Sequence, residues 1–141
     1  MGRESILDSL DRLNFRSRAG QRAPHKPLLA LYALGHWSRG EADGIPFRDV
    51  DRDLTPMLKE FGPPRQSYHP EYPFWRLQND GVWTVTAAGM LKARRSNCDP
   101  PKSELLAHDA RGGFSPEVQA ALRTDPALAG DIANKPWRLG T

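Results

Sequence analysis

The sequence predicts an α+β fold that is mostly helical. Apolar residues recur at helical spacing in several segments, and short extended pieces lie between them. Two strand-like runs, residues 74–78 and 82–86, are separated by Asn79-Asp80-Gly81, which is a strong signal for a β-hairpin. The order helix, short strand, helix, hairpin indicates a winged-helix-like core, with an extra N-terminal helix and further C-terminal helices.

The length and composition indicate a single domain over residues 1–141. A chain of 141 residues with 38% hydrophobic residues can bury its own core. The single cysteine, Cys98, excludes an internal disulfide and fits a reducing cytoplasm. No apolar run has the length of a membrane span, and the N-terminus has no apolar signal segment. We therefore expect a cytoplasmic protein with no membrane partner.

Three segments make up the predicted N-terminal part. Residues 4–13 form an amphipathic helix, and residues 16–23 form a basic loop. Residues 28–37 have almost no polar face, so we expect this segment to be the central buried helix. Pro27 fits its first turn, where a missing N–H costs nothing.

The middle of the chain reads as a short extended piece, residues 45–47, followed by a helix over residues 49–61. Val50, Leu54 and Leu58 share one face of this helix with Phe61. Pro56 lies inside it, and we expect a break there because proline removes a helical hydrogen bond.

The C-terminal part is predicted to contain short helices. Ser115 should cap one of them, with Pro116 in its first turn. Buried positions are expected at Val118, Leu122, Leu128 and Ile132. The remaining predicted elements are a helix over 87–94, a loop over 97–101, a helix over 102–108 and a turn over 111–114.

The charges are distributed unevenly along the chain. No acidic residue occurs from Arg12 to Arg39, which also contains Arg16, Arg18, Arg22 and Lys26. A second basic group occurs after residue 90, whereas residues 41–60 are rich in Asp and Glu. Such a distribution is typical of a nucleic-acid-binding face, although an ordinary solvated surface would explain it about equally well. The start of the central helix, with His25 and Lys26, offers backbone donors and a positive dipole end to a phosphate.

The most unusual stretch is residues 65–78, RQSYHPEYPFWRLQ, which combines two prolines, four Tyr, Phe and Trp rings, one histidine and arginines. Pro70 and Pro73 predict a stiff, non-helical path. A stiff surface of proline and aromatic side chains can form an apolar pocket, and arginines beside it suit a phosphate or a base edge. Packing of the rings into the core is the alternative.

The sequence carries no recognisable catalytic or metal motif. None of its four histidines has zinc-site spacing, Cys98 has no cysteine partner, and nucleotide-binding glycine motifs are absent. We therefore expect no enzyme activity, no metal and no cofactor. A histidine base at His25 or His69 is the weakest alternative, because we see no partner carboxylate.

Two long motifs resemble one known family. Residues 23–34, APHKPLLALYAL, and residues 67–77, SYHPEYPFWRL, with the following Asp80-Gly81-Val82-Trp83, resemble the sulfur-binding domain of phosphorothioation-dependent McrA-like restriction endonucleases. Gly112-Gly113-Phe114 resembles a third, shorter motif. Full-length members of that family add an HNH nuclease domain, which is absent from this sequence, so we expect a recognition module that is fused to or associated with a nuclease.

The resemblance implies binding of double-stranded DNA in which sulfur replaces a non-bridging phosphate oxygen. On this basis we assign an apolar sulfur pocket, DNA-backbone contacts and a set of candidate base-reading residues. The pocket comprises His69, Pro70, Tyr72, Pro73 and Phe74, supported by Tyr68 and Trp75. The DNA-backbone contacts are Arg18, Arg22, His25 and Lys26, and Ser67 also faces DNA. The candidate base-reading residues are Arg65, Gln66, Arg76 and Arg111. Two alternatives stay open, an ordinary winged-helix domain that reads unmodified DNA and a protein-interaction domain that uses residues 72–75 as an apolar patch.

Overall fold

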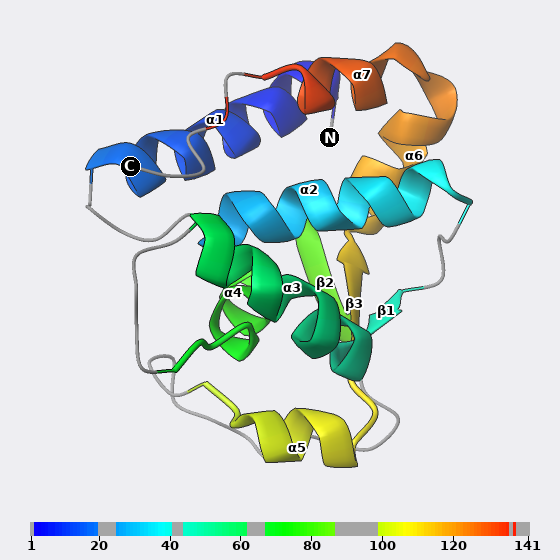
Figure 1. Cartoon of the computed structure of the whole chain (residues 1–141). Helices are drawn as coiled ribbons and strands as arrows, with labels where there is room; N and C mark the ends of the chain where they lie inside the picture. Colours follow the sequence, from blue (N-terminus) through cyan, green and yellow to red (C-terminus); the bar gives the residue numbers. More distant parts are fainter. Residues whose placement is uncertain are drawn as a thin grey trace.

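Helix α2 (His25–Ser38) lies at the centre of the computed structural model (Figure 1). The structure describes residues 2–19, 25–40, 44–61, 67–86, 99–135 and 137, and within residues 14–19 only the backbone. Helix α2 packs against α1, α3, α4 and α7. Six of its residues are buried, namely Pro27, Leu28, Leu29, Ala30, Ala33 and Leu34. The predicted central buried helix is therefore confirmed.

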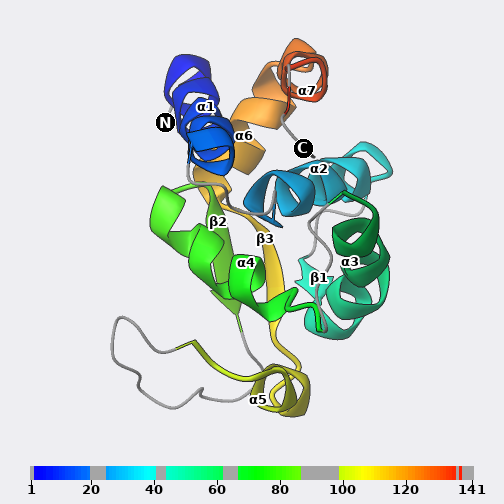
Figure 2. The same cartoon turned by 60° about the vertical axis from the view of Figure 1, so that its left-hand side comes forward.

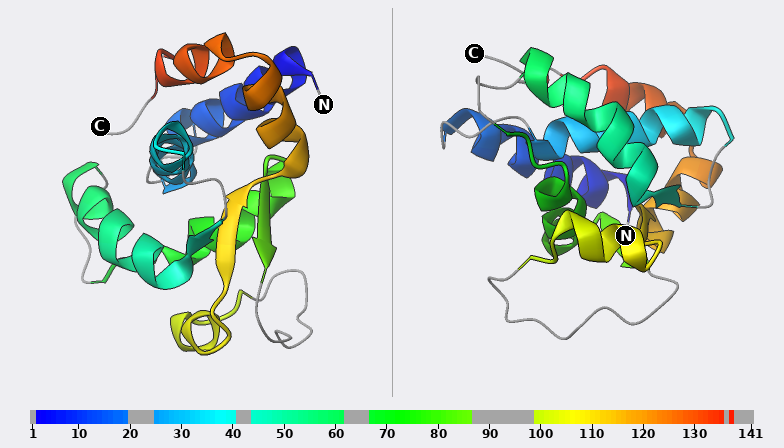
Figure 3. Two further views of the ribbon diagram at one scale, coloured as in Figure 1. Left: turned by 90° about the vertical axis from the view of Figure 1, so that its right-hand side faces the viewer. Right: turned by 60° about the horizontal axis from the view of Figure 1, so that its bottom comes forward.

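The remaining helices surround α2 and a small sheet. Helices α1 and α7 lie side by side above α2, and α5 lies at the opposite end of the molecule (Figures 1 and 3). The elements are α1 (Arg3–Ala19), β1 (Ile45–Pro46), α3 (Phe47–Phe61), α4 (Glu71–Arg76), the 3-10 helix η1 (Leu77–Asp80), β2 (Trp83–Thr86), α5 (Lys102–Ala107), β3 (Arg111–Phe114), α6 (Pro116–Thr124) and α7 (Ala127–Ala133). The predicted mostly helical α+β class is confirmed.

The sheet is antiparallel, with strand order β1-β3-β2. Ile45 pairs with Gly112, and Trp83 pairs with Phe114. Phe74 of α4 packs edge-on against Phe47, at 4.9 Å between ring centroids, and against Trp83, at 6.2 Å. The indole nitrogen of Trp83 donates a 2.9 Å hydrogen bond to the carbonyl oxygen of Phe74. Strand β2 therefore holds α4 through both ring packing and a buried hydrogen bond.

The predicted hairpin over residues 74–86 is wrong in its first half. Residues 71–80 form α4 and η1, and β2 pairs with β3 instead of a strand at 74–78. The stiff, non-helical path expected from Pro70 and Pro73 is also wrong, because both prolines lie at the start of α4, where the N–H groups have no helical partner. Gly81 ends η1 with a left-handed conformation, φ 80°, so the Asn-Asp-Gly signal marks a helix end.

The predicted turn at residues 111–114 is strand β3. Gly112 occurs there because two buried rings approach its backbone. A Cβ atom on Gly112 would lie 2.6 Å from Trp83 Cζ2 and 2.7 Å from Phe74 Cε2. Gly112 therefore serves close packing, and a turn was the wrong interpretation of the glycine pair.

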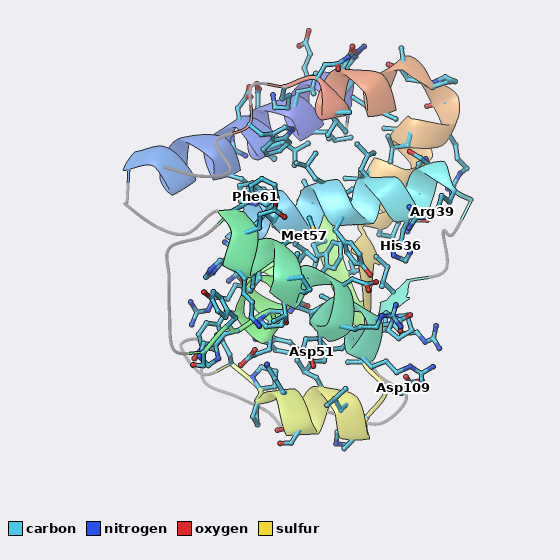
Figure 4. The ribbon with its side chains drawn as sticks, viewed as in Figure 1. His36, Arg39, Asp51, Met57, Phe61 and Asp109 are labelled. Carbon is cyan, nitrogen blue, oxygen red and sulfur yellow. The ribbon has the colours of Figure 1, made fainter. Side chains whose placement is uncertain are left out.

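Four smaller predictions also need correction. The predicted loop at 16–23 is wrong at its start, because α1 continues to Ala19. Pro56 causes no break in α3, where Val50, Leu54 and Leu58 are fully buried and outweigh one lost hydrogen bond. Phe61 was expected on the same face of α3, but it is 39% exposed. Figure 4 labels it together with Met57 of the same helix. Helix α6 begins at Pro116 as predicted, but the Ser115 side chain makes no capping bond.

Ion pairs and hydrogen bonds join the elements at the surface. Arg3 contacts Asp125 and Asp131 and so ties α1 to the region of α6 and α7. The hydroxyl of Tyr32 donates a 2.7 Å hydrogen bond to Asp53, which joins α2 to α3. Hydrogen bonds from Arg52 and then Tyr32 lower the pKa of Asp53 to about 2, although partial burial opposes them. No helix in the described ranges is long and apolar enough to cross a membrane.

Gly112→Ala should lower the free energy of unfolding by about 1–3 kcal/mol, the usual cost of overpacking a core. The added methyl would overlap the rings of Trp83 and Phe74. Gly113→Ala is the matched control, because its Cβ would meet its nearest neighbour, Gly44 Cα, at an ordinary 3.5 Å. Urea denaturation of both variants measures the difference, and equal stabilities would contradict the packing role of Gly112.

Candidate DNA-binding site

The residues that precede and begin α4 are joined by hydrogen bonds. His69 Nδ1 lies 3.0 Å from Glu71 Oε2, and His69 Nε2 lies 3.1 Å from Ser67 Oγ. A carboxylate oxygen accepts hydrogen bonds, so the tautomer of His69 with its proton on Nδ1 satisfies this contact. The Glu71 side chain is only 8% exposed, and its Oε1 atom has no hydrogen-bond partner in the described structure. A buried carboxylate held by one histidine fixes the orientation of that ring.

Tyr72 lies between a histidine and an arginine. The His69 ring stacks on the Tyr72 ring at 4.6 Å and an interplanar angle of 13°. The guanidinium carbon of Arg76 lies over the Tyr72 ring at 4.7 Å from its centroid. Arg76 Nε also donates a 2.6 Å hydrogen bond to Asp99 Oδ2. The predicted pocket residues His69 and Tyr72 and the predicted base reader Arg76 therefore form one stack.

The other predicted pocket residues lie at different depths. Tyr68 and Trp75 are half-buried, and Lys59 lies 5.9 Å from the Tyr68 ring centroid. Pro70 and Pro73 are buried, and Phe74 is fully buried in the core. Phe74 therefore cannot form the surface of a pocket in this structure and instead packs against Phe47 and Trp83.

Helix α2 packs against α4, and Figure 2 shows the two helices next to each other. Lys26 Nζ donates a 2.7 Å hydrogen bond to Asp80 Oδ2 at the end of η1. The Asp80 side chain is 8% exposed, and Lys26 is 27% exposed. This ion pair fixes the basic start of α2, with its positive dipole end, next to the α4 region. The structure thus joins Lys26 to η1, the element that follows α4.

Arg111 is not brought to this cluster. Gly112 faces Phe74 and Trp83, and side chains alternate along a strand, so Arg111 points to the other face of the sheet. There its Cβ lies 3.4 Å from a Cβ built on Gly44, and its guanidinium lies 3.7 Å from Asp109. The side chain of Arg18 and all of Arg22, Arg65 and Gln66 lie outside the described residues.

Sequence reasoning missed three acidic partners in this region, namely Glu71, Asp80 and Asp99. Glu71 is the carboxylate partner that we did not see for His69, two residues away within the same motif. Asp80 was interpreted as a turn residue, and Asp99 is 23 residues from Arg76 in sequence. Only the His-x-Glu spacing carried a local signal for any of these pairs.

The described residues also line a small cavity away from α4. One cavity of about 20 Å³ lies at the other end of α2, next to His36, Trp37 and Gln119. This volume holds a single water molecule. The ranges that the structure describes contain no cluster of three metal-ligating side chains.

The sequence matches the model of one known family over most of its length. Residues 3–136 match the sequence model of the ScoMcrA-like DNA sulfur-binding domain. The chain belongs to this family. No curated protein matches the sequence significantly. The resemblance seen in the two sequence motifs is thereby confirmed, and the family is one of DNA-binding domains.

Solved structures of ScoMcrA share the fold of this sulfur-binding domain. One is the sulfur binding domain complexed with phosphorothioated DNA, at 27% identity and TM-score 0.66, with 79% of this chain and 72% of that chain covered. A second contains the sulfur binding and SRA domains with phosphorothioated DNA, at 27% identity and TM-score 0.67, with 79% and 35% covered. A third is the Type IV phosphorothioation-dependent restriction endonuclease ScoMcrA, at 27% identity and TM-score 0.66; the same 79% of this chain spans only 21% of it.

His69→Phe should destabilise the sulfur-binding domain by about 1–3 kcal/mol or more, because Glu71 would be buried without its donor. Phenylalanine keeps a ring to stack on Tyr72, so the lost hydrogen bond dominates the effect. The double variant His69→Phe/Glu71→Leu should recover much of this loss, because both polar partners are then replaced. Thermal unfolding of the single and double variants tests the pair; a double variant no more stable than His69→Phe would contradict it.

Proposed function

We propose that this chain binds double-stranded DNA that carries a phosphorothioate linkage. The main observation is that Lys26, at the basic start of α2, is paired with Asp80 of η1, which directly follows the α4 segment that carries the aromatic stack of His69, Tyr72 and Arg76. The family membership and the complexes of ScoMcrA domains with phosphorothioated DNA support the same ligand. In our proposal the sulfur atom contacts the apolar side and the phosphate charge faces the cations.

Sulfur suits an apolar surface better than oxygen does. It is larger, less strongly hydrated and a poorer hydrogen-bond acceptor, so its desolvation costs less free energy. Tyr72 and the half-buried Tyr68 and Trp75 provide the aromatic surface. Pro73 is buried in α4 and is rigid, which limits the entropy lost when the pocket orders around the ligand. This set of residues can prefer sulfur over oxygen at the same phosphate.

The negative charge of the linkage requires nearby cations. Lys26 is held by Asp80, and His25 lies at the first position of α2, whose backbone N–H groups and dipole favour an anion. Release of counterions from DNA makes such contacts strongly dependent on salt. These residues supply affinity for any DNA backbone, and the aromatic surface adds the preference for sulfur.

The biological role that follows is recognition within a modification-dependent restriction system. We propose a single binding domain over residues 1–141 that acts with a fused or associated nuclease, and that has no nuclease activity of its own. One structural neighbour is a phosphorothioation-dependent restriction endonuclease, which supports this setting. An ordinary DNA-binding domain would share the fold and the charges but would not distinguish sulfur from oxygen.

The chain should bind a duplex with a phosphorothioate linkage at least about tenfold more tightly than the identical unmodified duplex. Tyr72→Ser should reduce this ratio more than it reduces affinity for unmodified DNA, because it removes apolar surface and leaves the cations in place. Fluorescence anisotropy with both duplexes, for the unchanged chain and the variant, measures the ratio. Equal affinity of the unchanged chain for both duplexes would overturn the proposed function.

Lys26→Ala should weaken binding to modified and unmodified duplexes by the same factor. The slope of log K against log salt should fall in magnitude by about 1, as expected for the loss of one phosphate contact. Arg123→Ala is the control, because Arg123 lies at the other end of α2, near Trp37, and its loss should leave the slope unchanged. A slope that stays constant in Lys26→Ala would remove Lys26 from the phosphate contacts.

A further inference from the structure

We propose that Arg76 reads a guanine next to the modified linkage and that Asp99 is the positioning residue that makes this possible. The inference rests on the proposed function, since it places DNA over the same aromatic stack. Its basis is the restraint on Arg76, which is held at two points while about half of its side chain stays exposed.

The first restraint is the hydrogen bond to Asp99. Arg76 Nε donates to Asp99 Oδ2 at 2.6 Å, and the Asp99 side chain is only 12% exposed whereas Arg76 is 47% exposed. A largely buried carboxylate that accepts from the inner nitrogen fixes the plane and direction of the guanidinium. The two terminal Nη nitrogens take part in no ion pair or hydrogen bond with a described residue.

The second restraint is the face of Tyr72, 4.7 Å below the guanidinium carbon. This ring is itself held, because His69 stacks on it and is fixed by the buried Glu71. His69 is three residues before Tyr72 and Arg76 is four residues after it, which places the tyrosine between the two along the chain. Two mostly buried carboxylates, Glu71 and Asp99, thus hold the two ends of one stack.

These restraints leave Arg76 a single way to bind. Asp99 occupies its inner edge, so the two terminal Nη groups remain as a planar fork. The major-groove edge of guanine presents N7 and O6 as a matching pair of acceptors, and arginine is its commonest partner. Lys26 is a point charge already paired with Asp80, and Arg111 points to the other face of the sheet. Of the cationic side chains described at this site, Arg76 is the one with a fork held in a fixed plane.

Replacement of Asp99 distinguishes the proposal from a simple charge effect, because the two predict changes of opposite sign in DNA affinity. Removal of a carboxylate near bound DNA strengthens binding if only charge matters, because DNA is a polyanion. If Asp99 acts through Arg76, Asp99→Asn instead weakens binding to the preferred sequence. Asp125→Asn is the matched control, because Asp125 is also paired with an arginine, Arg3, but lies between α6 and α7, away from α4.

The experiment uses phosphorothioate duplexes in which each G·C pair near the modified linkage is changed in turn to A·T. A second set has 7-deazaguanine at the most sensitive position, which removes N7 alone. For the unchanged chain we expect one position at which the change costs roughly fivefold or more in affinity, within the range of a bidentate base contact. Arg76→Lys keeps the charge but lacks the fork, so discrimination at this position should be lost while most affinity remains.

Asp99→Asn should lose the same discrimination and lower affinity for the preferred duplex, and it should add no further loss in an Arg76→Ala background. Thermal unfolding of each variant confirms that it is folded. Full base discrimination in Arg76→Lys, or tighter binding by Asp99→Asn, would overturn the proposal. An equal loss of affinity for all duplexes, together with a smaller slope of log K against log salt, would also overturn the proposal, because it indicates a phosphate contact. A chain that does not prefer sulfur at all would instead fail the proposed function, and the unmodified duplexes show this separately.

Discussion

The packing of Phe74 against the sheet is the constraint on which the rest of the site depends. Its ring is fully buried and lies against Phe47 and Trp83, and its carbonyl oxygen accepts the hydrogen bond of the Trp83 indole. Gly112 allows this approach because any side chain there would overlap both rings. Helix α4 has only six residues and would not be stable alone. Tertiary packing therefore holds it, and with it the half-buried Tyr72 and Trp75 and the exposed Arg76.

The sequence predicted the centre of this fold better than its periphery. The apolar run of residues 28–37 can only be a buried helix, and the buried positions Val118, Leu122, Leu128 and Ile132 follow from simple periodicity. The hairpin prediction failed because Phe, Trp and the Asn-Asp-Gly signal are compatible with either a strand and turn or a short helix and its end. Tertiary contacts, which a local pattern does not contain, decide between them.

The residue types of the candidate site could be predicted from the sequence, but the contacts between those residues could not. The aromatic and proline content of residues 67–77, and the cationic start of α2, could be found without a structure. Their partners could not, because Asp80 and Asp99 are distant in sequence from Lys26 and Arg76. Phe74 shows a second limit of prediction from sequence, because an aromatic side chain in a Pro-aromatic motif can lie in the core as well as at the surface. Only burial distinguishes the rings that support the surface from those that form it.

Three acidic side chains with little exposure, Glu71, Asp80 and Asp99, accompany three cationic or polar groups at a surface proposed to bind a polyanion. For affinity alone this arrangement is unfavourable, because each carboxylate reduces the local positive potential. Its benefit is orientation, since a side chain held before binding loses less entropy on binding and can distinguish a correct geometry from an incorrect one. Sulfur differs from oxygen by size and hydration and leaves the total charge of the linkage unchanged, so discrimination must come from shape and placement. Positioned cations beside a rigid aromatic wall meet that requirement, whereas a denser but mobile basic surface would bind both DNAs alike.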